Sequence, residues 1–356
     1  MNPIFQRLMN GATRLTQAGD LQAATAAIQA VLTGGVMPAS APNDVREVID
    51  VAAHELPEVA PAGDGVPAPA GRGPASGRFI AGSHGNTYGH RDFKLYVPPG
   101  AGERPLPLVV MLHGCTQSPD DFAAGTAMND VALAQGFFVL YPAQSQRANP
   151  QRCWNWFKHN HQVRGRGEPA LLAEMTRGVM KTHSIDPQRV YVAGLSAGGA
   201  MAAILGDAYP DLFAAVGVHS GLAAGIATDL PSALGAMKSG GTKIRDGASG
   251  VATIVFHGDA DSTVHPRNSE QVIAASVGKA PEVEVEQRKA AGGRAYTRSV
   301  HRQSDGSVVA EHWLVHGARH AWSGGNAKGS YTDAGGPDAS AEMIRFFLAH
   351  PRRQTH

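Results

Sequence analysis

The pentapeptide at residues 194–198, Gly-Leu-Ser-Ala-Gly, places a serine between two glycines, which is the spacing of a nucleophile elbow. A strand-like run, VYVA, precedes it, and a helix-like run rich in small residues follows it, as that tight turn requires. The N-terminus of the helix favours negative charge on the serine oxygen. Ser196 is therefore the predicted nucleophile of an acyl-transfer reaction; the alternative is a glycine- and serine-rich turn that arose by chance.

A serine hydroxyl is a weak nucleophile unless a base takes its proton and an acid orients that base. In hydrolases built around such a turn, the acid and then the base follow the serine along the chain. Two carboxylates, Asp259 and Asp261, come after a strand-like run, and we favour Asp261 because it precedes a turn at residues 264–266. Asp259 is expected to brace its loop by hydrogen bonds to backbone N–H groups. His320 lies in a glycine-flanked loop after the strand-like run 311–315 and is the predicted base.

Acyl transfer also requires two backbone N–H groups that stabilise the negatively charged oxygen of the tetrahedral intermediate. One is expected from Ala197, directly after the nucleophile, and the other from the loop that follows the apolar run 106–112. In that loop, the N–H of Cys115 is the predicted second donor, and His113 is expected to be a structural residue that holds the loop.

Strand-like and helix-like segments alternate between about residues 86 and 350, which predicts an α/β fold with a mostly parallel central sheet flanked by helices. The run 106–112 (LPLVVML) is continuously apolar, as in a strand buried on both faces. Other strand-like runs lie at 93–97, 137–141, 190–193, 213–218, 251–256 and 283–288, with a hairpin over 296–301 and 308–315. Helix-like runs lie at 120–135, 168–182, 197–207, 269–277 and 338–349. Together with the serine turn, this order predicts an α/β-hydrolase fold.

The chain before this domain divides into two parts. Residues 1–34 repeat apolar side chains at close to a 3.6-residue period and are predicted to form an N-terminal helical segment. It is expected to pack on the main domain or to form an oligomer contact; the alternative is an amphipathic anchor for a hydrophobic surface. Residues 35–85 are rich in proline, alanine and glycine, which indicates a linker. The catalytic domain is therefore assigned to residues 86–350.

Several segments that follow one another in the chain are LHGCTQSPDDFA (112–123), CWNWF (153–157), VYVAGLSAGGAMA (190–202), HGDADSTVHPRN (257–268) and HAWSGG (320–325). Together and in this order they resemble the polyhydroxybutyrate depolymerase family and its relatives, the feruloyl and acetylxylan esterases. The resemblance covers about residues 88–350 and implies the same triad, Ser196, Asp261 and His320, and the same oxyanion donors. It also implies that Cys115 and Cys153 lie near each other; whether they are bridged is left open.

Aromatic residues near these motifs are the predicted substrate-binding groups. Trp154, Asn155 and Trp156 lie between a strand-like and a helix-like run, and Trp322 follows the predicted base by two residues. We expect at least one of the tryptophans to form an apolar wall for a polyester chain or a planar phenolic acid. Asn155 is expected to orient a carbonyl or a loop. The alternative places most of these side chains in the core.

Composition excludes several classes of function. The net charge of +1 gives no reason to expect a nucleic-acid partner, and no run of about 18 apolar residues predicts a membrane span. The N-terminus does not match a secretory signal, so we expect a cytoplasmic protein in which the two cysteines are thiols by default. His159 and His161 lack further ligands at metal-site spacing, so neither a metal nor a cofactor is predicted.

The predicted activity is hydrolysis of polyhydroxybutyrate or its 3-hydroxybutyrate oligomers through an acyl-enzyme intermediate, with a polymer granule surface as a candidate partner. A feruloyl or acetylxylan esterase is the first alternative, although a cytoplasmic location argues against cell-wall polymers as substrates. A granule-associated binding protein that retains an esterase fold is the second alternative, and an intact triad argues against it.

Overall fold

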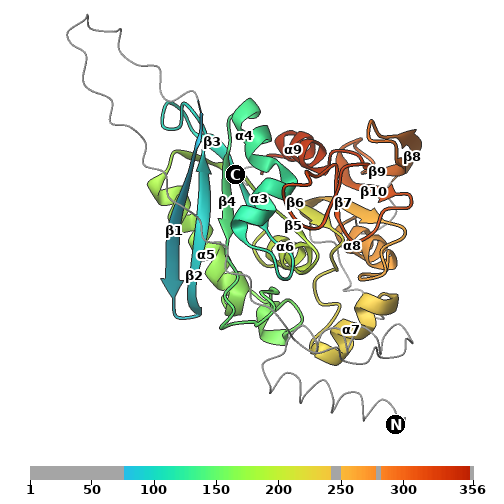
Figure 1. Ribbon diagram of the computed structural model, residues 1–356, viewed down its shortest axis with the longest axis horizontal. Coiled ribbons are helices and arrows are strands. Elements are labelled where there is room, and N and C mark those ends of the chain that lie inside the picture. The colour runs from blue at the N-terminus through green and yellow to red at the C-terminus, as the bar shows by residue number, and fades with distance from the viewer. Residues whose placement is uncertain (1–75, 242–249, 278–281, 353–356) are drawn as a thin grey trace, which may run out of the picture. The chain divides into compact units, whose positions relative to one another are not determined.

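The structure, a computed structural model, describes residues 76–241, 250–277 and 282–352 (Figure 1). The predicted N-terminal helical segment, residues 1–34, and the predicted linker as far as residue 75 lie outside the described residues. Within the described ranges, no helix has the length and hydrophobicity needed to cross a membrane.

A ten-stranded sheet runs through the described part of the chain in the order β1-β2-β4-β3-β5-β6-β7-β10-β9-β8. Its strands are β1 (Arg78–Asn86), β2 (Gly89–Val97), β3 (Leu106–Leu112), β4 (Phe138–Pro142), β5 (Ile185–Leu195), β6 (Ala215–His219), β7 (Ala252–Gly258), β8 (Glu282–Lys289), β9 (Ala295–Arg302) and β10 (Val308–Val315). Neighbours in the central block from β4 to β10 are parallel. At the two ends, β1 and β2 and also β9 and β8 are antiparallel. The predicted mostly parallel sheet and the β9–β10 hairpin are confirmed.

Helices cover both faces of this sheet (Figure 1). They are α3 (Pro119–Thr126), α4 (Met128–Gln135), α5 (Gly167–Thr182), α6 (Ala197–Ala208), α7 (Leu230–Ser239), α8 (Arg267–Val277) and α9 (Ala339–Ala349). Alternate residues of β3 enter two separate cores: Leu108, Val110 and Leu112 pack with α5, α6 and α8. Val109 and Met111 pack with α3, α4 and α9. Because both faces are covered, the apolar run is continuous, as expected for a parallel strand.

The structure corrects two boundaries of the sequence analysis. Residues 78–85, predicted as the end of the linker, belong to β1, which pairs antiparallel with β2 along its whole length. The predicted helix 120–135 is two helices, because Ala127 between them has a left-handed φ of +50°. An L-residue in that conformation ends the regular helix.

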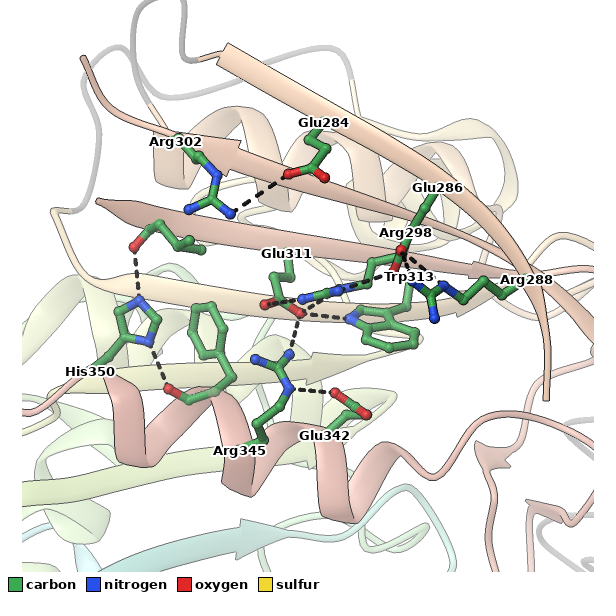
Figure 2. Close-up of polar contacts among 12 residues, drawn as sticks. Glu284, Glu286, Arg288, Arg298, Arg302, Glu311, Trp313, Glu342, Arg345 and His350 are labelled. Atoms are coloured by element: carbon green, nitrogen blue, oxygen red, sulfur yellow. Dashed lines mark hydrogen bonds and ion pairs between the residues drawn. The ribbon is translucent and has the colours of Figure 1, made fainter. Parts of the chain in front are cut away.

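An ionic network ties the antiparallel end of the sheet to α9 (Figure 2). The buried carboxylate of Glu311 on β10 accepts hydrogen bonds from Arg298 on β9 at 2.8 Å and from Arg345 on α9 at 2.6 Å. The indole N–H of Trp313 donates to the same carboxylate at 3.1 Å. Burial opposes ionisation of Glu311, but the two guanidinium groups outweigh it and hold its pKa below the usual range. The network fixes β10, the strand that leads into the loop of His320.

Candidate active site

Ser196 occupies the sharp turn between β5 and α6, with a backbone φ of +58° that L-residues rarely adopt. Its N–H donates to the carbonyl oxygen of His219 at 2.8 Å. Neither flanking glycine leaves room for a side chain. A Cβ on Gly198 would lie 2.0 Å from the carbonyl oxygen of Leu112, and one on Gly194 would lie 2.4 Å from the carbonyl carbon of Gly198. The close approach of β3, β5 and α6 therefore requires both glycines and holds Ser196 at the carboxyl edge of the sheet.

Asp261 and His320 are brought together although 59 positions separate them in the chain. Because β7 and β10 are parallel neighbours, the loops that follow them leave the same edge of the sheet side by side. The Nδ1–H of His320 donates to Oδ2 of Asp261 at 2.6 Å. Oδ1 of Asp261 accepts the N–H groups of Thr263 at 2.8 Å and Val264 at 2.9 Å. With Nδ1 protonated, the neutral imidazole has Nε2 available to accept a proton.

The Asp261 carboxylate is buried but ionised. Burial opposes its ionisation, yet the contact with His257 and the hydrogen bond from His320 outweigh that effect. The pKa of Asp261 therefore lies well below its usual range. A carboxylate that stays ionised can stabilise the imidazolium formed when a base takes a proton.

Asp259, the alternative acid, binds a different loop. Its Oδ1 accepts the N–H of Gly317 at 2.6 Å, and its Oδ2 accepts the Nδ1–H of His316 at 2.8 Å. Nε2 of His316 in turn accepts the hydroxyl of Thr297 at 2.9 Å. Asp259 therefore braces the segment that leads to His320. It does so through a backbone N–H, as predicted.

The predicted oxyanion loop passes directly beside the nucleophile. A Cβ built on Gly114 would lie 3.7 Å from the Cβ of Ser196. Ala197 begins α6, and the first N–H groups of a helix have no intrahelical acceptor. The N–H of Cys115 donates to no acceptor within the described part of the chain. Among the residues that the structure describes, neither predicted donor thus has a hydrogen-bond acceptor.

His113 holds this loop, as predicted. Its Nδ1–H donates to the carbonyl oxygen of Gly114 at 2.7 Å, and its Nε2 accepts the N–H of Gln144 at 3.0 Å. Burial lowers the pKa of His113 to about 4, so the ring is neutral near pH 7. His113 is therefore a structural residue and not a second base.

A disulfide joins Cys115 to Cys153, which corrects the default expectation of two thiols. Beside it, the N–H of Thr116 donates to the carbonyl oxygen of Gln151 at 2.7 Å. The two links fasten the oxyanion loop to the loop that follows β4. The position of the predicted donor Cys115 thus depends on a covalent bond between segments that are far apart in the sequence.

We expect the Cys153→Ser variant to lose about 3 kcal/mol of its free energy of unfolding, because the bridge constrains a loop of 38 residues in the unfolded chain. Urea unfolding with and without a thiol reductant measures this loss. The reductant should lower the free energy of unfolding of the wild type to that of the variant, and it should not change the free energy of unfolding of the variant. A wild type that keeps its stability after the bridge has been reduced would contradict the prediction.

Glu168, at the start of α5, is a buried carboxylate that the sequence analysis did not single out. It accepts hydrogen bonds from Arg91 at 3.2 Å, from Gln144 at 2.5 Å, and from the backbone and side-chain N–H groups of Asn155 at 2.7 and 2.8 Å. Burial opposes its ionisation, but the contact with His161 at 3.6 Å and the hydrogen bonds from Gln144 and Asn155 outweigh it and lower the pKa of Glu168. This cluster anchors the loop that follows β4.

The four side chains predicted to bind substrate are all buried, at most 5% exposed: Trp154, Asn155, Trp156 and Trp322. The indole N–H of Trp154 donates to the carbonyl oxygen of His113, and that of Trp322 to the hydroxyl of Ser340, both at 3.1 Å. The three rings pack in the core, so their burial lends no support to the aromatic substrate wall, which stays a prediction. Asn155 orients its loop through Glu168.

An exposed aromatic ring lies beside the oxyanion loop at Tyr331, which no sequence motif marks. Tyr331 is 47% exposed and has a φ of +53°. Its hydroxyl lies 3.3 Å from Oγ1 of Thr116, and its carbonyl oxygen accepts the N–H of Trp322 at 2.7 Å. Tyr331 thus connects the oxyanion loop to the loop of His320. Strained backbone of this kind concentrates at functional positions.

The sheet and the three side chains at its edge define the class of protein. A mostly parallel sheet with helices on both faces presents a serine at a strand-to-helix turn and an aspartate–histidine pair at the same edge, which is the arrangement of an α/β-hydrolase. The chain belongs to the family described as Esterase PHB depolymerase, which matches residues 91–294. The resemblance seen in the sequence is therefore confirmed.

Two curated relatives are similar to parts of this chain. Poly(3-hydroxyalkanoate) depolymerase C of Paucimonas lemoignei is 31% identical over 254 residues, covering 66% of this chain and 59% of the relative. Feruloyl esterase B of Thermothelomyces thermophilus is 31% identical over 198 residues, covering 50% of this chain and 67% of the relative. The chain thus spans about three fifths of the length of the depolymerase that it matches.

Among solved structures, an acetyl xylan esterase from Aspergillus awamori is similar, with a TM-score of 0.57 and 21% identity. The match covers 73% of this chain and 94% of that chain. At this identity the likeness supports the α/β-hydrolase fold and does not extend to the substrate.

Proposed function

We propose that this protein is a serine carboxylic ester hydrolase that cleaves polyhydroxybutyrate or its 3-hydroxybutyrate oligomers. The observation that carries the proposal is the 2.6 Å hydrogen bond between His320 and Asp261, at the edge of the sheet where the strained turn holds Ser196. A nucleophile, a base and an orienting acid are the three groups that acyl transfer from an ester requires.

In the proposed reaction, Nε2 of His320 takes the hydroxyl proton of Ser196 as the serine oxygen attacks the ester carbonyl. The N–H groups of Cys115 and Ala197 stabilise the negative charge on the carbonyl oxygen, and Asp261 stabilises the imidazolium. The imidazolium then protonates the leaving alcohol, and an acyl-enzyme remains. Water, deprotonated by His320, attacks the acyl carbon; the bond to the serine oxygen breaks, His320 returns the proton to Ser196, and the acid is released. None of these steps calls for a cofactor.

The substrate class is supported by the family and by the relative whose name states depolymerisation of poly(3-hydroxyalkanoate). A second candidate is a feruloyl or acetylxylan esterase, which the relatives of those names favour. A granule-binding protein without activity is the third reading. The buried, ionised Asp261 paired with His320 argues against it, because that pairing serves no purpose in adsorption.

A substrate panel separates these functions. Purified wild type and Ser196→Ala would be given amorphous polyhydroxybutyrate granules, 3-hydroxybutyrate oligomers, methyl ferulate and acetylated xylan. Release of hydroxybutyrate that depends on Ser196, with little ferulate or acetate, supports the proposal. Efficient release of ferulate or acetate with the granules untouched would move the substrate to the second candidate, and no Ser196-dependent hydrolysis at all would leave the binding protein.

Tyr331→Ala should raise KM for the preferred ester about fivefold while kcat changes less than twofold, since the exposed ring offers apolar contact outside the reacting atoms. Tyr331→Phe keeps the ring and loses only the hydroxyl beside Thr116, so its KM should stay near that of the wild type. Initial rates over a range of substrate concentrations give both constants. A KM that stays constant in Tyr331→Ala would show that the substrate does not touch this ring.

The cytoplasmic location remains a proposal, and the disulfide opposes it, because such bonds are rare in reducing compartments. Rapid acid quenching of cells, alkylation and mass spectrometry of the Cys115 and Cys153 peptides provide the test. Two alkylated thiols would support the cytoplasm, whereas a bridged pair would assign the protein to an oxidising compartment.

A granule surface remains the proposed partner, and co-sedimentation of the full chain with polyhydroxybutyrate granules tests it.

A further inference from the structure

His257, the last residue but one of β7, lies against the acid of the proposed triad. It is 0% exposed. Its Nε2 is 2.8 Å from the carbonyl oxygen of Val264 and 3.3 Å from Oδ2 of Asp261, the oxygen that also binds His320. A second histidine therefore contacts the same carboxylate oxygen from inside the protein.

The neighbours of His257 determine where its proton lies. A carbonyl oxygen only accepts hydrogen bonds, so Nε2 carries the hydrogen that is donated to Val264, and Oδ2 of Asp261 lies 3.3 Å from the same nitrogen. Nδ1 of His257 is buried and has no partner among the described residues. A proton placed there would be a buried donor without an acceptor, so the ring is the neutral Nε2–H tautomer.

We propose that His257 is a positioning residue of the hydrolytic site, whose Nε2–H holds Oδ2 of Asp261 and shares its negative charge with His320. The inference rests on the proposed function, since it concerns the same triad. By withdrawing charge from Oδ2, the donor makes the carboxylate a weaker acceptor for the imidazolium of His320. Loss of this donor would make the carboxylate a stronger acceptor and favour the charged imidazolium, which cannot take the proton of Ser196.

The other titratable groups around this cluster do not change charge in the relevant range. His219 and His312 both face His257, and His219 also faces His320. Burial lowers the pKa of His312 to about 4 and holds the pKa of His219 well below its usual range. Burial thus keeps both rings neutral near pH 7, so neither supplies the acidic limb of the pH profile there.

Two variants of His257 separate the donor from the volume of the ring. His257→Gln keeps an amide N–H at about the reach of Nε2, whereas His257→Leu keeps similar bulk and has no donor. The matched control is His312→Leu, which removes a neighbouring buried histidine whose Nε2 bonds to Ser269 and not to the triad. The readout is the rate at which a fluorophosphonate labels Ser196, followed by mass spectrometry from about pH 5 to pH 9.

We expect His257→Leu to react about tenfold more slowly near pH 6, with its acidic limb moved to higher pH by about one unit. His257→Gln should restore the position of the limb, and His312→Leu should leave it in place. With an ester substrate, the loss in His257→Leu should fall on kcat and leave KM unchanged. Rates are expressed per labelled Ser196, so a partly folded preparation still reports the limb.

Three results would overturn the inference: an unmoved limb in His257→Leu, equal impairment of His257→Gln and His257→Leu, or a limb moved to lower pH. If His257→Leu does not fold at all, His257→Asn, whose shorter amide does not reach Oδ2, takes its place with the same expected shift. Failure of the proposed function looks different. In that case Ser196 of the wild type would not react with the fluorophosphonate. The wild type alone would show this result, without any comparison among the His257 variants.

Discussion

Ser196→Ala is expected to lower kcat/KM by about 10⁴-fold or more on any ester that the wild type cleaves, because the variant lacks the atom that forms the acyl-enzyme. The backbone strain at φ +58° persists with alanine, so the free energy of unfolding should change by less than about 1 kcal/mol. Hydrolysis assays, with urea unfolding of the same preparations, measure both quantities.

The matched control for this variant is Ser304→Ala, which removes a hydroxyl from an exposed serine in the turn between β9 and β10. Its kcat/KM should equal that of the wild type. Residual activity in Ser196→Ala within about tenfold of the wild type would contradict the assignment of the nucleophile, since the oxyanion donors alone do not sustain such a rate.

Glu168→Ala is expected to lose about 3–5 kcal/mol of the free energy of unfolding, the usual effect of removing one partner from a buried ionic cluster. The change leaves Arg91, which is 7% exposed, without its carboxylate, and it leaves the N–H groups of Asn155 without their acceptor. The folded-state pKa of Glu168 lies below that of the unfolded chain, so its stabilising effect is complete above about pH 4.5 and is lost as the pH falls below it.

Urea unfolding at neutral pH and again near pH 4 measures this contribution, and the difference between variant and wild type should shrink at the lower pH. Glu174→Gln on the same helix is the matched control, because Glu174 accepts a hydrogen bond from Asn86 in an exposed position. It should change stability by less than about 1 kcal/mol. An equal effect of the Glu168 and Glu174 variants would show that the buried cluster does not anchor its loop.

The parts of the site that sequence predicts are those governed by local pattern. The turn around Ser196 depends on glycines that are adjacent in the chain, and the sheet order depends on the alternation of strands and helices. Asp261 and His320 follow strands in the expected order, and their pairing in the structure agrees with the choice of Asp261 over Asp259. These features need no knowledge of distant contacts.

The features that sequence did not predict depend on partners far along the chain. Glu168 stands at the centre of a buried hydrogen-bond cluster because Arg91, which lies 77 positions away in the sequence, donates a hydrogen bond to its carboxylate. Tyr331 is exposed because of the loop that holds it, whereas the motif-adjacent Trp154 and Trp322 are core residues. An aromatic side chain suits a pocket wall or a core equally well, so residue type alone does not decide between them.

The β9–β10 turn lies at the end of β10 opposite the loop of His320. Since β10 has eight residues, the turn and that loop are separated along the strand by about 26 Å. The turn contains Gly306 at φ +80°, and its neighbours Ser304 and Asp305 are exposed. A fluorescent domain spliced into this turn would point away from the reacting edge of the sheet. It would therefore give a tagged enzyme whose encounter with particles of the proposed polymer substrate can be followed by microscopy while the site stays unobstructed.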